Sequence, residues 1–250
     1  MSLTGKVALV TGGAKNLGAE ISRDFAALGA SLAIHYNSDK TKQDASELEA
    51  SLKEKYPKLK VKFYQGDLTT AGAVESLFSS VKKDLGKVDI IVNTIGKVLK
   101  KPIGDITEKE YDEMFAINSK SAFLILQAGS KYIEDGGSII TIVTALLAAF
   151  TGFYTSYAGS KAPVEHFTRG VSKELQGRQV RVNAIAPGPM DTPFFYPQES
   201  PEAVEFHKSQ GLGGRLTQIQ DISPLVRFLC TDGGWITGQT IFANGGYTTR

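Results

Sequence analysis

Cysteine is nearly absent from this sequence, since Cys230 is the only one. One cysteine can form neither an intramolecular disulfide nor a cysteine-based metal site. The three histidines, His35, His166 and His207, do not have the spacing of metal ligands, so we expect no metal site. With 250 residues and a hydrophobic content of 42%, the chain is long and apolar enough for the buried core of a globular protein.

Long apolar runs and clustered charge are also missing. The N-terminal apolar run, residues 7–10, is too short for the hydrophobic region of a signal peptide, and no segment is long enough to cross a bilayer. We therefore expect a soluble, cytoplasmic protein that does not bind membranes. The formal net charge is only +2 and the lysines are scattered, which argues against binding to nucleic acid.

Short β-branched runs alternate with helical segments along the chain. Strands are expected at residues 6–10, 31–36, 61–65, 88–93, 138–143, 180–185 and 240–243. Helices are expected between them at 17–28, 41–55 and 71–85, and a long helix that ends near 132 opens with a capping box formed by Thr107 and Glu110. This alternation predicts an α/β fold, a doubly wound parallel sheet of about seven strands with helices on both faces.

No linker, repeat or low-complexity tract divides the chain, so residues 1–250 are expected to form a single domain. The least regular stretch, residues 189–214, is long for a connection and contains aromatic residues. Loops of this kind are usually lids or binding loops. We expect this segment to cover a substrate site.

The loop after the first strand, TGGAKNLG at residues 11–18, has the composition of a phosphate-binding turn. Its glycines, among them Gly12 and Gly18, allow a tight turn and a close approach to a pyrophosphate, whose charge then lies at a helix N-terminus. Between these glycines lie Lys15, Asn16 and Leu17. In a strand–loop–helix context this loop predicts dinucleotide binding.

The residues after the second strand indicate which dinucleotide is preferred. An acid there would hydrogen-bond the ribose 2′-hydroxyl of NAD and repel a 2′-phosphate. The position holds Tyr36, followed by Asn37 and Ser38, while Lys15 and Lys40 can supply positive charge. The missing acid favours NADP(H).

Tyr157 and Lys161 are the most informative pair in the chain. Because they are four residues apart on an expected helix, they lie on the same face. A phenol has a pKa of about 10, and a nearby ammonium favours the phenolate and lowers that value. A hydroxyl residue, Thr144, stands upstream at the end of the expected strand 138–143.

Together these features resemble the short-chain dehydrogenase/reductase family over nearly the whole chain. The resemblance implies a Rossmann-type fold and an NADP(H)-dependent enzyme that acts on CH–OH or C=O groups by hydride transfer. Tyr157 would exchange the proton of the reacting oxygen, and Lys161 would lower the pKa of Tyr157 and hold the nicotinamide ribose. Thr144 would replace the usual serine that hydrogen-bonds this oxygen. Asn118 resembles the family asparagine that supports a proton-relay water near the lysine.

Further segments of the cofactor site follow the family pattern with some departures. The residues that resemble family cofactor contacts outside the glycine loop are Asp67 with Leu68, Asn93 and Gly96 in the turn NTIG, and Pro187, Gly188 and Thr192 in the segment PGPMDT. In the family, the aspartate contacts the adenine and the threonine binds the nicotinamide carboxamide. Within the glycine loop, Asn16 replaces a glycine, and because asparagine tolerates left-handed backbone we expect the turn to be preserved.

Aromatic residues flank the expected cleft and favour an apolar or aromatic carbonyl substrate. They are Phe150, Phe153, Tyr154, Phe194, Phe195 and Tyr196. Core or interface roles explain half of them equally well. The residues expected to bind substrate are Thr144, Phe153, Tyr154, Phe194 and Phe195. The predicted activity is the NADPH-dependent, reversible reduction of a ketone to a secondary alcohol.

Three other functions stay open: a 3-oxoacyl-(carrier protein) or pteridine reductase, a polyol or alcohol dehydrogenase, and a non-enzymatic NADP-binding sensor. A sensor would not need Tyr157, Lys161 and Asn118 together. For the carrier-protein function, Arg178 would match one arginine of a basic patch, but Asp135 stands where another would be. Since family members commonly pair the Asn118 and Tyr157 helices across two-fold axes, we expect a homo-oligomer, a tetramer or a dimer.

Overall fold

Most of the strands form where the sequence is rich in β-branched and apolar residues. The computed structural model describes residues 2–149 and 151–249, so Phe150 lies outside the described residues. The strands are β1 (Val7–Thr11), β2 (Ser31–Tyr36), β3 (Val61–Gln65), β4 (Val88–Asn93), β5 (Ile133–Ile142), β6 (Arg181–Pro187) and β7 (Thr240–Ala243). All neighbours pair in parallel, in the order β3-β2-β1-β4-β5-β6-β7, which confirms the predicted seven-stranded parallel sheet.

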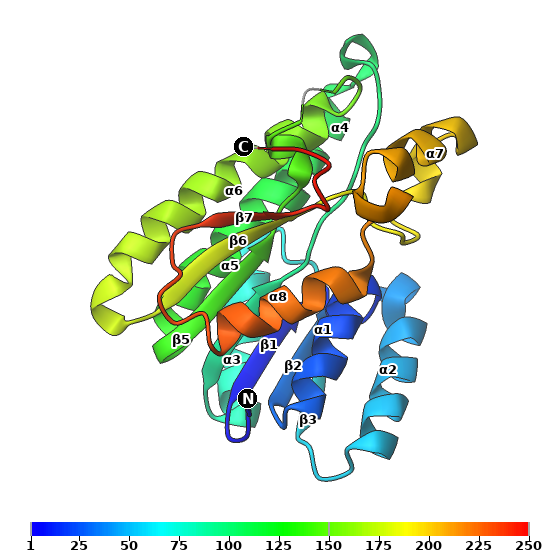
Figure 1. The fold of residues 1–250 in the computed structure, drawn as a ribbon. Helices are drawn as coiled ribbons and strands as arrows, with labels where there is room; N and C mark the ends of the chain where they lie inside the picture. Colours follow the sequence, from blue (N-terminus) through cyan, green and yellow to red (C-terminus); the bar gives the residue numbers. More distant parts are fainter. Residues whose placement is uncertain (1, 150, 250) are drawn as a thin grey trace.

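Helices cover both faces of this sheet (Figure 1). One face carries α1 (Asn16–Ala27), α2 (Lys42–Lys55) and α8 (Ile219–Cys230), and the other carries α3 (Ala71–Leu85), α5 (Ser121–Tyr132) and α6 (Thr155–Glu174). Two shorter helices are α4 (Glu108–Phe115) and α7 (Pro201–Ser209). Within the described ranges, no helix combines the length and the apolar character that spanning a bilayer requires.

The alternation of side chains along the strands divides the core into two layers. In β1, Leu9 belongs to the cluster that includes Phe78 of α3, whereas Val10 belongs to the cluster that includes Phe25 of α1 and Leu229 of α8. All five side chains are fully buried. Since burying a large apolar side chain contributes about 1.5–3 kcal/mol, these two layers hold the helices against the sheet.

Strand β5 begins five residues earlier than the expected strand at 138–143. Ile133 pairs with Val88, and the register then shifts before Ser138 pairs with Ile90. The intervening residues, EDGG at 134–137, include no apolar side chain, so the sequence pattern showed only the buried half of this strand.

The order of the strands reverses between β1 and β4, because the chain passes from β1 to β2 and β3 and then returns to the other side of β1. In open α/β sheets this reversal creates a crevice at the carboxyl ends of the strands, where ligands bind. The amide of Thr94, just after β4, donates to the carbonyl of Thr11, the last residue of β1, and joins the two strand ends at 3.0 Å. The fold therefore places the glycine loop beside this crevice.

Candidate functional site

The glycine loop adopts a conformation that larger side chains would block. Gly12 has a left-handed φ of 69°, and a Cβ on Gly18 would lie 2.2 Å from the carbonyl oxygen of Gly12. The third glycine of such a loop thus allows close packing of helix and loop. Asn16 adopts a φ of 48°, which confirms the expectation that asparagine preserves the left-handed turn.

His35 fixes this loop from behind, a role that the sequence did not indicate. In β2, its Nδ1 accepts the Gly12 N–H at 3.3 Å, and its Nε2 lies 2.8 Å from the Gly66 carbonyl oxygen. These partners require the neutral tautomer with the proton on Nε2. Burial lowers the pKa of His35 to about 4, so the ring stays neutral near pH 7 and joins the glycine loop to the segment before Asp67.

A cleft of about 690 Å³ runs along the carboxyl ends of β1, β2 and β4. It is lined by most residues that the sequence indicated for the cofactor: Gly12, Lys15, Asn16, Leu17, Gly18, Tyr36, Asn37, Ser38, Asp67, Leu68, Gly96, Tyr157, Lys161 and Thr192. Lys40 also lines it, beside Tyr36. The lining includes an ion pair that the sequence did not suggest, Lys97 with Glu113 at 2.6 Å.

Three expected cofactor residues do not line this cleft. The side chain of Asn93 is buried behind it, where Oδ1 accepts the Thr11 hydroxyl at 2.8 Å and the Ile95 N–H at 3.1 Å. Asn93 therefore shapes the turn after β4. Pro187 and Gly188 line a neighbouring pocket instead.

Tyr157 and Lys161 lie where the cleft meets that second pocket. Both residues are buried, with exposed fractions of 7% and 4%. The Lys161 ammonium donates to the carbonyl oxygen of Ile142, at the end of β5, at 3.0 Å and to that of Ile95, in the loop after β4, at 3.2 Å. Thr144 is also buried, and its hydroxyl is hydrogen-bonded to Tyr157.

The pKa values at this junction differ from the expectation that Lys161 lowers the pKa of Tyr157. Burial raises the pKa of Tyr157 to about 12, and the hydrogen bond from Thr144, rather than the ammonium, opposes the rise. Burial also lowers the pKa of Lys161 to about 8. The reason is geometric, because Lys161 points its ammonium at two backbone carbonyls.

Asn118 lies in a π-helical turn, Ala116–Lys120, that joins α4 to α5. Its Oδ1 accepts the Lys97 N–H at 2.9 Å, and its Nδ2 donates to the Lys97 carbonyl at 2.8 Å and to Ser160 Oγ at 2.9 Å. Ser160 in turn donates to the carbonyl of Tyr157 at 2.7 Å. Asn118 thus connects the loop after β4 to the Tyr157 helix.

The expected capping box is confirmed at the start of α4. Glu110 N–H donates to the Thr107 hydroxyl at 3.2 Å, and Thr107 N–H donates to a Glu110 carboxylate oxygen at 2.8 Å. The helix continues to Tyr132 as expected, but the π-helical turn within it had no sequence signal. Such turns are frequent at functional sites.

The second pocket is mostly apolar and continuous with the cleft, since Val143, Tyr157, Met190, Thr192 and Phe194 line both. Thr144, Tyr154, Phe194 and Phe195 line it as expected for substrate-binding residues. Phe153 does not, because its backbone has a φ of 67° and its side chain is 55% exposed. The pocket also contains residues that the sequence did not indicate, among them Glu199, His207 and Tyr247.

The segment 189–214 is more regular than expected and contains α7, which lies beyond the carboxyl ends of the strands (Figure 1). Ser200 caps this helix by accepting the Ala203 N–H at 3.2 Å, and Pro201 occupies its first turn. Phe195 packs with Val204 in a small separate cluster. No group of three or more His, Cys, Asp or Glu side chains that could hold a metal occurs among residues 2–149 and 151–249.

Comparisons with known proteins agree with this architecture. A family model described as enoyl-(acyl carrier protein) reductase matches residues 12–248. A short-chain type dehydrogenase/reductase of Picea abies is 34% identical over 253 residues, covering 98% of this chain and 93% of the relative. The NADPH-dependent aldehyde reductase 2, chloroplastic, of Arabidopsis thaliana is 34% identical over 260 residues, covering 98% and 95%. The crystal structure of a putative dehydrogenase from Burkholderia cenocepacia with bound NADP is 53% identical, with a TM-score of 0.96 and coverage of 100% and 96%.

Proposed function

Because this chain belongs to the short-chain dehydrogenase/reductase family and is an NADP(H)-dependent oxidoreductase, we propose that it reversibly reduces an apolar or aromatic ketone to a secondary alcohol. The observation that carries this proposal is the pair of hydroxyls, Thr144 and Tyr157, at the junction of the cofactor cleft and the apolar pocket. A carbonyl oxygen bound between them would meet two hydrogen-bond donors.

The cleft fits NADPH in shape and charge. The absence of side chains at Gly12 and Gly18 leaves room for a pyrophosphate, and Lys15 and Lys40 lie near the end of β2 where the 2′-phosphate would be held. Lys161 and Thr192 would hold the nicotinamide end. When bound, NADPH supplies the hydride.

Residues of the chain would then supply the proton and stabilise the charge on the reacting oxygen. With its pKa near 12, Tyr157 carries its proton at neutral pH and can donate it to the developing alkoxide. Thr144 would donate a hydrogen bond to the same oxygen and stabilise its charge. Lys161, with a pKa near 8, is mostly protonated at pH 7, so it would offer its ammonium to the nicotinamide ribose in the cleft. Asn118 would keep the Lys97 loop and the Tyr157 helix in register.

The lid role of residues 189–214 is part of this proposal. Phe194, Phe195, Glu199 and His207 come from this segment and all line the pocket. The apolar part of this wall, Phe194 and Phe195, favours an apolar substrate body.

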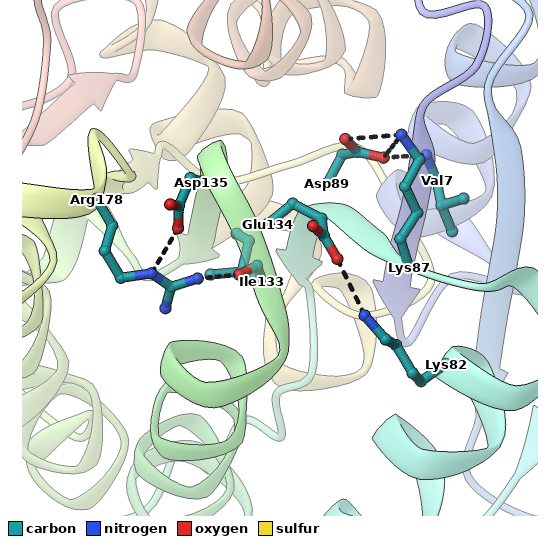
Figure 2. Close-up of polar contacts among 8 residues, drawn as sticks. All are labelled: Val7, Lys82, Lys87, Asp89, Ile133, Glu134, Asp135 and Arg178. Carbon is teal, nitrogen blue, oxygen red and sulfur yellow. Dashed lines mark hydrogen bonds and ion pairs between the residues drawn. The ribbon is translucent and has the colours of Figure 1, made fainter.

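The alternative function, reduction of a 3-oxoacyl-(carrier protein), requires a basic patch to bind the acidic carrier, and the surroundings of Arg178 do not favour such a patch. Arg178 Nε donates to Asp135 at 2.7 Å, and the guanidinium also donates to the carbonyl of Ile133 (Figure 2). A third hydrogen bond runs from the guanidinium to the carbonyl of Ser130. Asp135 thus neutralises the arginine that an acidic carrier would need. This leaves the free ketone as the favoured substrate.

The test is the oxidation of NADPH by purified protein across aryl ketones, a 3-oxoacyl thioester and a pterin, with a polyol and NADP⁺ for the reverse reaction. We expect the aryl ketones to give the highest kcat/KM. Turnover confined to the thioester, the pterin or the polyol would contradict the proposal.

We expect NADPH to be preferred over NADH by at least about tenfold in kcat/KM, roughly 1.4 kcal/mol. The reason is that Tyr36 stands in place of an acid, with Lys15 nearby in the cleft. Tyr36→Asp should reverse or erase the preference. Lys58→Gln, which shifts net charge equally at an exposed position outside the cleft, should leave it unchanged. Equal use of both cofactors by the unmodified protein would contradict this prediction.

We further propose that the protein is a homo-oligomer, a tetramer or a dimer, paired through α5 and α6. Phe123 of α5 is 45% exposed and packs edge to face against Phe167 of α6, with ring centroids 5.4 Å apart. An apolar surface on adjacent helices suits a two-fold interface. Light scattering at micromolar concentration should give a multiple of the 26.9 kDa chain mass, and Phe123→Glu should lower it. A mass of one chain for the unmodified protein would defeat the proposal.

A further inference from the structure

A buried polar cluster closes one end of the otherwise apolar pocket. At its centre is Glu199, whose side chain has an exposed fraction of 0%. One carboxylate oxygen lies 2.5 Å from Lys100 Nζ, and the other accepts the Tyr154 hydroxyl and lies 3.5 Å from His207 Nε2. The partners come from the loop after β4, the start of α6 and the lid, and all except Lys100 line the pocket.

Glu199 is ionised at neutral pH. Burial raises the pKa of this carboxyl, but the hydrogen bonds from Lys100 and Tyr154 together outweigh burial and hold the pKa below its usual range. The charge of Lys100 balances that of the carboxylate. An ionised carboxylate has no proton to donate, so each hydrogen bond at Glu199 uses a proton of its partner.

This fixes the direction of the hydrogen bond between Tyr154 and Glu199. Tyr154 commits its only hydroxyl proton to Glu199, so its oxygen can offer only lone pairs to the pocket. His207 Nε2 faces the same carboxylate, and its Nδ1 lies 2.8 Å from the Tyr247 hydroxyl oxygen. The Tyr154 oxygen, in this part of the pocket, is therefore an acceptor without an available proton.

The cluster lies close to the reacting centre. The ring centroids of Tyr154 and Tyr157 are 6.1 Å apart, and the Tyr154 hydroxyl reaches from there to Glu199. A substrate whose carbonyl oxygen meets Tyr157 would thus extend its other end toward the Tyr154 oxygen and Glu199. The apolar walls leave few alternative polar partners along the way.

We propose that Tyr154, with its proton oriented by Glu199, selects carbonyl substrates that carry a hydroxyl group at the end remote from the carbonyl. The inference rests on the ketone reductase function proposed above and specifies its substrate class. A hydroxyl can donate to the Tyr154 oxygen, whereas a methoxy or carboxylate group would place a second acceptor opposite this acceptor. Sites built to bind a substrate hydroxyl reject analogues without it, because the polar groups of the site are left unpaired. Tyr154 is the specificity-determining residue and Glu199 is a positioning residue.

The experiment compares aryl ketones of similar size that carry a hydroxyl, methyl or methoxy group at the remote end, each reduced with NADPH. We expect the unmodified protein to favour the hydroxyl ketone by at least about tenfold in kcat/KM over both others. Glu199→Gln introduces an amide that can donate to the Tyr154 oxygen and free its proton, so the ratio of hydroxyl to methoxy should fall below about threefold. Tyr154→Phe removes one acceptor and should reduce the ratio of hydroxyl to methyl.

Glu205→Gln is the matched control, because Glu205 lies on α7 in an exposed ion pair with Lys208. It should leave both ratios unchanged. Since each ratio compares two substrates on one protein, a general loss of stability cancels, and the melting temperature reports that loss separately. Equal kcat/KM for all three ketones, or an unchanged ratio in Glu199→Gln, would overturn the inference while the proposed function stands. Failure to reduce any of the three would overturn the proposed function and the inference with it.

Discussion

Replacing Tyr157 with phenylalanine is expected to lower kcat for ketone reduction by about 10³-fold. The phenol carries the proton that the developing alkoxide needs, because burial holds its pKa near 12. Phenylalanine keeps the ring in its buried position next to Tyr154 and removes only the hydroxyl. Stopped-flow or steady-state assays of NADPH oxidation measure the loss of kcat. Titration with NADPH shows whether cofactor affinity is retained.

Tyr132→Phe provides the matched control for this substitution. The Tyr132 hydroxyl lies on the surface, where it donates to Glu75 and lies 2.9 Å from Ser79, and Tyr132 does not line the cleft. Removing it should leave kcat unchanged. If Tyr157→Phe retained kcat within about tenfold of the unmodified protein, another group would have to donate the proton, and the proposed role of Tyr157 would be wrong.

Thr144→Val is expected to lower kcat by about 10²-fold or more, the usual cost of removing an oxyanion-type donor. Valine keeps the β-branched shape and deletes the hydroxyl that contacts Tyr157. The same substitution removes an acceptor for the Leu146 N–H at 3.3 Å, so a modest loss of melting temperature should accompany it. NADPH affinity should change little, because Thr144 lines the substrate pocket and not the cofactor cleft.

Thr144→Ser separates the hydroxyl from the shape of the residue. It should retain most of the activity and admit bulkier ketones, since only the methyl group is lost. If Thr144→Val turned over within threefold of the unmodified protein, Thr144 would be a packing residue. Tyr154 would be the first candidate for a substitute donor, but its proton is committed to Glu199, so it makes a poor one.

Local patterns predicted the fold because each strand and helix carries its own signal. The runs at 31–36, 61–65, 71–85, 88–93 and 240–243 have the same bounds in the structure as in the prediction. The glycine loop and the pair Tyr157 and Lys161 were also readable, because their chemistry lies within one turn or one helix. The helix α7 was missed although Ser200 and Pro201 form a recognisable start, because the aromatic residues before it suggested a loop.

Residues that act across the fold could not be found in this way. Glu199 meets Lys100 and Tyr154 only after three distant segments have packed together, and an isolated glutamate in a sequence resembles a solvated surface charge. The sequence excluded His35 only as a metal ligand, because its two backbone partners come from segments that meet it in the fold. The same limit explains Phe153, whose left-handed backbone turns it away from the pocket that its neighbour Tyr154 lines.

The π-helical turn at 116–120 sets the rotational phase between α4 and α5. Its defining hydrogen bond runs from the Ser121 N–H to the carbonyl of Ala116, five residues back, so the turn holds one residue more than an α-helical turn. Each residue of an α-helix advances the side chains by about 100°. Deleting one residue here would leave a regular helix but would rotate either Met114 or Ile125 out of the core. The same rotation would break the hydrogen bond from Asn118 to Ser160. The extra residue thus lets the continuous helix from α4 to α5 bury both Met114 and Ile125, which a uniform α-helix could not do.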